Sequence, residues 1–127
     1  MIIKKLVVGS MFSMLLGSEM AAADWGDVYY CQMTNFLEIT LQGEKTNYTP
    51  QKFQFKLDQT TNAMVFGSTG FFENSVFELT KGRNWPSQES WNANTKYSMG
   101  YFEDGKFLYT YNGSAGAVAA SADCDKF

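Results

Sequence analysis

The chain has 127 residues, a formal net charge of −3 and no histidine, and 17% of its residues are aromatic. This length suits one small domain, and the aromatic content supplies enough apolar surface for a core, which argues against intrinsic disorder. The acidic balance argues against binding to nucleic acid, because such proteins need clustered lysine and arginine.

Residues 1–23 have the three parts of a secretory signal peptide. Two lysines charge its start, Leu6–Gly17 is apolar, and Ala21–Ala23 offers the small residues that signal peptidase needs. The alternative is a membrane anchor, but the apolar run is shorter than the roughly 20 residues that cross a bilayer. We therefore expect cleavage after residue 23 and a mature single domain, residues 24–127, that is periplasmic or secreted.

The carboxyl end raises the alternative of an outer-membrane barrel, because a terminal aromatic such as Phe127 is typical of those proteins. Asp125, Asp123 and Ser121 occupy the alternate positions that would face lipid. We therefore expect no membrane span in the mature chain.

Cys31 and Cys124 are the two cysteines of the chain. In an exported protein an even count is most simply explained by one disulfide, which here would join the two ends of the domain. The alternative is a metal site on the two thiolates, but the chain offers no histidine to complete it. We expect a disulfide, no metal and no cofactor.

The dominant hydrophobic period along the mature chain is two. Lys52–Asp58 alternates throughout, which predicts a half-buried strand. Weaker runs of the same kind follow turn residues at Val28–Met33, Phe36–Leu41, Ala63–Phe66 and Val76–Thr80. The pattern predicts an all-β fold, a small antiparallel barrel or sandwich of seven to eight strands.

Tyr97–Asn112 carries the clearest hairpin signal, because Asp104-Gly105 suits a type I′ turn. Counting outward from that turn predicts one face made of the pairs Phe102–Phe107, Gly100–Tyr109 and Ser98–Tyr111. It predicts a second face made of Tyr101–Leu108, Met99–Thr110 and Tyr97–Asn112. Aromatic rings should cover the glycine. Because both faces carry aromatics, the second face should either line a cavity or meet a partner.

Ser114–Asp123 consists mainly of alanine, glycine and serine. We expect a last strand that delivers Cys124 to Cys31. The alternative is a short alanine helix, which Gly113 and Gly116 would weaken.

Candidate ligand-binding residues are aromatic or polarisable side chains near this hairpin: Trp85, Trp91, Tyr97, Met99 and Tyr101. Such side chains stack on sugars or fill a partner's pocket. The alternative for the two tryptophans is that they cap the barrel as core. The expected partner is a small apolar or sugar-like ligand, or another exported protein.

Catalysis is restricted by composition. Without histidine there is no Ser-His-Asp triad, and disulfide-bonded cysteines supply no thiolate. Paired carboxylates could still hydrolyse glycosides, with Glu73 and Glu78, or Glu103 and Asp104, as the close pairs. The alternative places these residues in turns or on outward strand positions, so we do not expect an enzyme.

Four short segments resemble the periplasmic inhibitors of C-type lysozymes: Tyr29-Tyr30-Cys31, Ser68-Thr69-Gly70-Phe71-Phe72, Leu79-Thr80-Lys81-Gly82 and Ala122-Asp123-Cys124. The resemblance implies a small antiparallel β-barrel. It also implies that Ser68 and Lys81 reach into the lysozyme cleft, where a lysine would pair with catalytic carboxylates. Three functions follow in order: an exported non-catalytic binding module, a lysozyme inhibitor, and a small carboxylate-dependent glycoside hydrolase.

Overall fold

Alternation of side chains along the strands builds a closed antiparallel sheet. In the computed structural model, which describes residues 22–80 and 90–127, Phe53, Phe55 and Leu57 are buried while Lys52 and Lys56 are exposed. The strands are β2 (Val28–Thr40), β3 (Lys45–Asn47), β4 (Lys52–Asp58), β5 (Ala63–Phe66), β6 (Val76–Leu79), β7 (Ser90–Asn94), β8 (Ser98–Glu103), β9 (Lys106–Asn112) and β10 (Gly116–Lys126).

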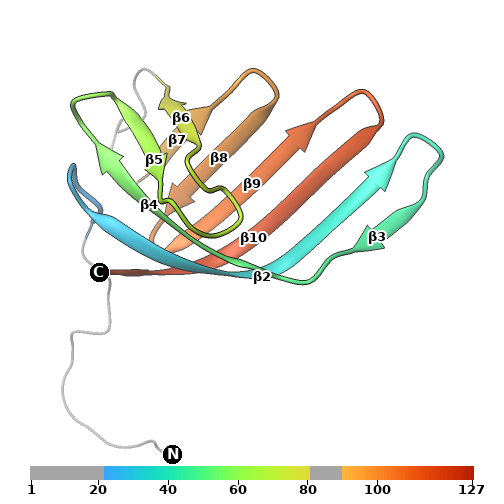
Figure 1. Cartoon of the computed structure of the whole chain (residues 1–127), viewed down its shortest axis with the longest axis horizontal. Helices are drawn as coiled ribbons and strands as arrows, with labels where there is room; N and C mark the ends of the chain where they lie inside the picture. Colours follow the sequence, from blue (N-terminus) through green and yellow to red (C-terminus); the bar gives the residue numbers. More distant parts are fainter. Residues whose placement is uncertain (1–21, 81–89) are drawn as a thin grey trace, which may run out of the picture.

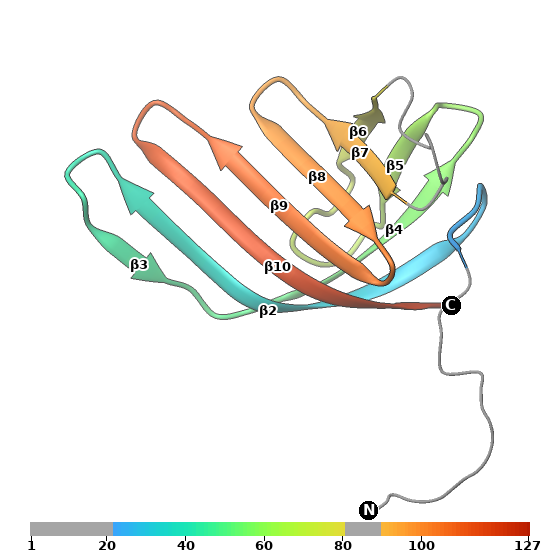
Figure 2. The same ribbon diagram turned by 180° about the vertical axis from the view of Figure 1, so that it is seen from behind.

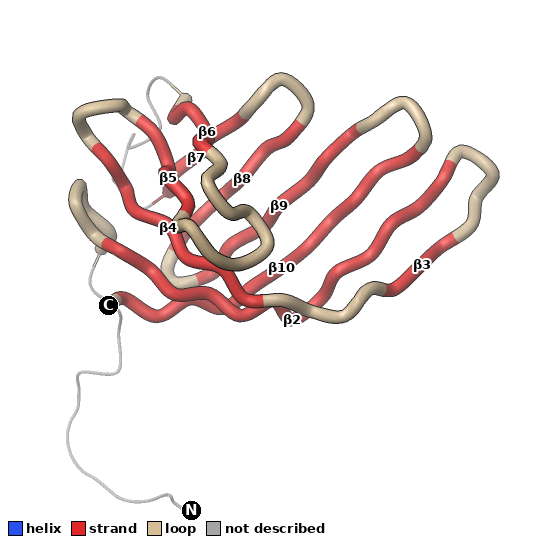
Figure 3. Tube along the Cα trace, viewed as in Figure 1, coloured by secondary structure: helices blue, strands red, loops and turns tan. Residues whose placement is uncertain are grey.

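Eight of these strands form the barrel, in the order β2-β4-β5-β6-β7-β8-β9-β10, and the pairing of β10 with β2 closes it (Figure 1). β3 lies outside this ring, paired with the distal part of β2. The described residues contain strands and loops but no helix (Figure 3). The predicted all-β antiparallel barrel is confirmed.

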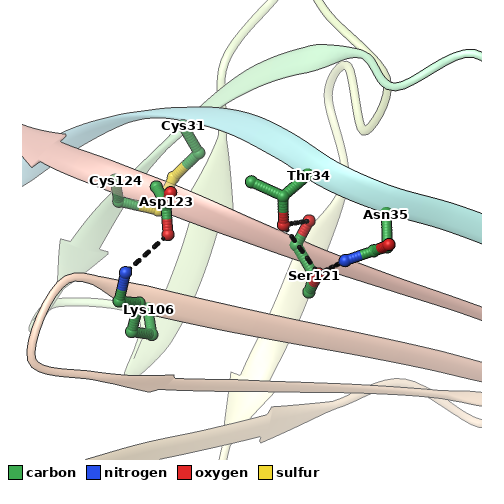
Figure 4. Close-up of polar contacts among 7 residues, drawn as sticks. All are labelled: Cys31, Thr34, Asn35, Lys106, Ser121, Asp123 and Cys124. Carbon is green, nitrogen blue, oxygen red and sulfur yellow. Dashed lines mark hydrogen bonds and ion pairs between the residues drawn. A yellow bond between two sulfur atoms is a disulfide. The ribbon is translucent and has the colours of Figure 1, made fainter.

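β2 is long enough to pair with three strands. It pairs with β10 along most of its length, with β4 near its start and with β3 near its end. A bulge at Thr34 interrupts the pairing with β10, so Met33 and Phe36 both point inward although three positions separate them. Asn35 Nδ2 donates to Ser121 Oγ at 2.9 Å, and Thr34 Oγ1 lies 2.8 Å from the same hydroxyl oxygen (Figure 4). Ser121 therefore anchors the bulge.

The predicted disulfide between Cys31 and Cys124 is present. The two residues lie opposite each other on β2 and β10, and 93 positions separate them in the sequence (Figure 4). Each cysteine is 4% exposed. The bond therefore crosses the seam that closes the barrel, inside the core.

The β8–β9 hairpin has the predicted register. Asp104 and Gly105 have φ angles of 52° and 78°, as a type I′ turn requires, and Phe102 pairs with Phe107. Gly100 faces the interior, where a Cβ would lie 3.2 Å from Phe107 Cζ. The ring thus occupies the space that a side chain at position 100 would need.

The alanine-rich segment forms β10, so the alternative of a short helix is wrong. β9 and β2 pair with β10 on its two sides. A Cβ at Gly116 would lie 2.5 Å from Ile39 O, so the strand end needs glycine there. Two partner strands satisfy the backbone of this segment, which outweighs the helix propensity of alanine.

Aromatic rings fill the barrel. The loop between β5 and β6 folds against β4 and inserts Phe72 among the interior rings, 4.9 Å from the Phe53 and Phe66 centroids and 4.7 Å from Tyr109. Gly70 permits this fold with a φ of +99°, and Phe71 N–H donates to Lys52 O at 3.1 Å. The other interior rings and large side chains include Tyr29, Phe55, Leu57, Met64, Phe77, Trp91, Phe102 and Phe107.

Candidate binding surface

Closure of the barrel places one face of the β8–β9 hairpin inside and the other outside. Phe102, Phe107 and Tyr109 point into the packed interior. The other face lies on the outside, with Tyr97 56% exposed and Met99 51% exposed. Tyr97, Met99 and Tyr101 therefore do not line an interior cavity but lie on the outer surface of the barrel.

The two tryptophan candidates have different outcomes. Trp91 is 2% exposed, and its ring lies edge-on to Trp25 with centroids 5.1 Å apart. Trp91 is therefore a core residue, as the alternative expectation had it. Trp85 lies outside the described residues.

The outer side of the hairpin carries four cross-strand pairs of side chains, which follow one another along its length as four rows. The register places Met99 opposite Thr110 and Tyr101 opposite Leu108 in the middle. At the two ends the rows are Tyr97 with Asn112 and Glu103 with Lys106. We call these four rows the hairpin face; Figure 2 views the molecule from this side, with β8, β9 and β10 next to one another. The two central rows are uncharged.

The end of the hairpin face near the Asp104-Gly105 turn is acidic. The Tyr101 hydroxyl donates to the Glu103 carboxylate, and this hydrogen bond raises the pKa of Tyr101. Lys106 Nζ donates to Asp123 Oδ1 at 2.8 Å, which raises the pKa of Lys106 (Figure 4). A groove of about 540 Å³ adjoins this end, lined by residues that include Tyr101, Leu108 and Ser121.

The opposite end of the hairpin face carries one cation. Lys96, in the β7–β8 turn, places its Nζ 5.3 Å from the centroid of the Tyr97 ring. The turn is held by Ser98 N–H, which donates to Thr95 Oγ1 at 3.1 Å. A second groove, of about 430 Å³, lies beside Lys96, Tyr97 and Met99. Near the turn Glu103, Asp104 and Asp123 outnumber Lys106, so the face has a net acidic end, an uncharged middle and a basic end.

Leu108 was not among the candidates from the sequence, although it is 49% exposed and lies opposite Tyr101. The signal was available, because the Asp104-Gly105 turn sets the register that pairs them. Leu108 was missed because the sequence criteria selected aromatic and methionine side chains and left out aliphatic ones.

The inhibitor-loop candidates are described in part. Ser68 is exposed on the β5–β6 loop, and Gly67 N–H donates to Gln54 O at 3.0 Å beside it. Lys81 lies outside the described residues. Ser68 lies on the loop that leads from β5 to the start of β6, whereas Thr80 directly follows the end of β6. The two residues therefore lie at opposite ends of β6.

The carboxylate pairs lie at the surface. Glu73 and Glu78 are exposed, on the β5–β6 loop and on the outer side of β6. Glu103 and Asp104 end β8 and begin its turn, also exposed. Within residues 22–80 and 90–127, no three histidine, cysteine or acidic side chains gather as a metal site would need.

Comparison with known proteins gives no relative: the chain matches no protein-family model, no curated protein and no solved structure. No helix in the described part of the chain is long and apolar enough to span a membrane.

Proposed function

We propose that this protein is an exported, non-catalytic binding protein that holds a protein partner against its hairpin face. The observation that carries the proposal is the exposure of Tyr97, Met99 and Leu108 on one ordered hairpin. Clustered apolar side chains on the surface of a small domain mark interaction sites, and tyrosine and methionine are enriched in interfaces.

The geometry favours a surface partner over an enclosed ligand. Phe53, Phe72 and Phe107 pack against one another inside the barrel, with centroids 4.9 to 6.1 Å apart. Enclosing a small molecule would require displacing these rings. The hairpin face needs no such rearrangement, because its side chains are already exposed on a backbone that cross-strand hydrogen bonds hold in place.

Surface chemistry supports a non-catalytic role. A general acid for glycoside hydrolysis needs an apolar environment that keeps its proton on at neutral pH. Glu73 and Glu78 are exposed to water instead. Export to the periplasm or medium is supported by the signal-like residues 1–23 and by the buried disulfide, which oxidising compartments preserve.

The test is a photo-crosslinking amino acid placed at position 99 in cells that export the protein. A matched control places it at Lys56, whose side chain is 51% exposed on β4, four strands from β8 in either direction round the barrel. We expect an adduct from position 99 that position 56 does not give. Equal adducts from both positions, or none from 99, would contradict the proposal.

A lysozyme inhibitor is the second candidate, favoured by the closed antiparallel barrel and by the exposed Ser68 on a loop with a fixed backbone. A preorganised loop loses little entropy when it enters an enzyme cleft. If the protein acts this way, it inhibits C-type lysozyme, and Ser68→Ala and Lys81→Ala weaken inhibition whereas Met99→Arg does not. Absence of inhibition by the unmodified protein would dismiss this candidate.

A further inference from the structure

We infer that the occupant of the hairpin face is a second copy of this chain, packed face to face about a twofold axis. The axis lies in the plane of contact, perpendicular to the strands, between the Met99–Thr110 row and the Tyr101–Leu108 row. The inference rests on the proposed function, because it names the partner of the same surface.

The central rows are complementary under this symmetry. A twofold axis in that position sets each strand antiparallel to the same strand of the second copy, so Met99 lies over Tyr101 of the second copy and Leu108 lies over Thr110. Methionine sulfur packs favourably on an aromatic ring, and leucine packs on the threonine methyl group. Each contact occurs twice, as an isologous interface requires.

The end rows are complementary in charge. The same symmetry places the basic end of one copy over the acidic end of the other, so Lys96 and Tyr97 meet Glu103 and Asp104 of the second copy. Asn112 meets Lys106 and can accept its hydrogen bond through the amide oxygen. An axis parallel to the strands would instead set the two acidic ends against each other, which electrostatic repulsion disfavours.

The flanking strands leave room for the contact. Beside the central rows, β10 presents the short side chains of Ala119 and Ser121, and β7 presents Asn92 and Asn94. No charged side chain stands in either flank at these rows. Small and polar flanks let the apolar rows approach and supply a polar rim.

The contact area marks the dimer as weak. If β7 to β10 all made contact, four strands spaced at about 4.8 Å and a seven-residue β9 rising about 3.4 Å per residue would cover at most roughly 450 Å² per copy. The total of at most about 900 Å² lies below the standard interface, so we expect a dimer that dissociates on dilution.

The test is sedimentation of the purified protein over a concentration series, with a charge swap at the two ends. Lys96→Glu and Glu103→Lys should each weaken dimerisation at least about tenfold, because each sets like charges together. The double variant should restore it, because the twofold axis sets the exchanged charges against each other. Lys56→Glu, on β4 and four strands from β8 in either direction round the barrel, should leave dimerisation unchanged. The near-ultraviolet circular dichroism of each variant shows that the monomer is folded.

The outcomes separate this inference from the proposed function. A protein that is still entirely monomeric at about 1 mM, where even a millimolar dissociation constant gives substantial dimer, would overturn the dimer. A double variant that fails to recover would also overturn it. The crosslinker at position 99 then distinguishes a second copy of the chain from a different protein. An adduct of twice the chain mass that joins residues 99 and 101 supports the dimer. An adduct with a different protein keeps the binding function and overturns the dimer, and no adduct overturns both.

Discussion

Reducing the disulfide between Cys31 and Cys124 is expected to lower the free energy of unfolding by about 4 to 5 kcal/mol. The bond joins residues 93 positions apart, so it closes a loop that contains nearly all of the described domain. In the chain-entropy model the contribution grows with the logarithm of loop length, which places this bond near the upper end of its usual range. That is a large part of the roughly 5 to 15 kcal/mol that stabilises a typical domain.

Urea unfolding followed by tryptophan fluorescence measures this difference, because Trp91 is buried against Trp25 and its surroundings change on unfolding. Three forms should be compared: the oxidised protein, the reduced protein and the Cys31→Ala/Cys124→Ala variant. The reduced protein keeps both sulfur atoms, so the decrease in its free energy of unfolding measures the effect of loop closure alone. With a urea dependence of about 1.5 kcal/mol per molar, the midpoint should fall by about 3 M.

The alanine variant should lose about 1 to 2 kcal/mol more than the reduced protein, because it also empties space in a core where each cysteine is 4% exposed. If the reduced protein stays within about 1 kcal/mol of the oxidised form, the loop-closure reasoning is refuted. The reduced unfolded chain would then already be compact, so that the bond removes little of its conformational entropy.

Three further predictions concern single positions. Gly100→Ala should lower the free energy of unfolding by about 1 to 2 kcal/mol, because its Cβ would lie 3.2 Å from Phe107 Cζ. In urea melts the same change should cost less in a Phe107→Leu background than in the unmodified protein, whereas a neutral Gly100→Ala would contradict the packing. Gly70→Ala should lower the free energy of unfolding by about 2 kcal/mol or more, because φ is +99° and the Cβ would lie 2.7 Å from Lys52 O. Thermal unfolding measures this loss, and an unchanged midpoint would mean that the loop can adopt another conformation. Burial first, and then the charge of Asp27, raise the pKa of Tyr29 to about 12 from 10.0. The folded state thus favours the neutral phenol, and the resulting stability is complete below pH 10 and lost as the pH rises toward 12. In an absorbance titration of tyrosinate formation, the Tyr29→Phe variant should lack the step that occurs at the highest pH. If the variant still shows that step, the step belongs to another tyrosine.

The local signals in the sequence were sufficient for the strands and for one register. Alternation over Lys52–Asp58 predicted a half-buried strand because side chains of a strand point to opposite faces in turn. Asp104-Gly105 predicted the pairing of β8 with β9 because few residues adopt two successive positive φ angles. Each signal depends on neighbouring residues and needs no knowledge of the rest of the chain.

The bulge at Thr34 and the insertion of Phe72 could not be read from the sequence. A bulge shifts the alternation by one residue, so Val28–Met33 and Phe36–Leu41 appeared as two strands although they form the single strand β2. Phe72 belongs to a loop, where periodicity carries no information about burial. Its position depends on β4, which lies beside that loop only in the folded barrel.

By itself the sequence determined the all-β class, the β8–β9 register and the pairing of Cys31 with Cys124, because turn chemistry, period-two alternation and a count of two cysteines each allow one simple solution. Only the tertiary structure decided which face of the hairpin is inside. Both faces carry aromatics, so hydrophobicity could not choose between them. Closure of the barrel chose the face with Gly100, because Phe107 and Phe77 fill the space a larger side chain would take there. That choice leaves Tyr97, Met99 and Leu108 on the outside as the candidate binding surface.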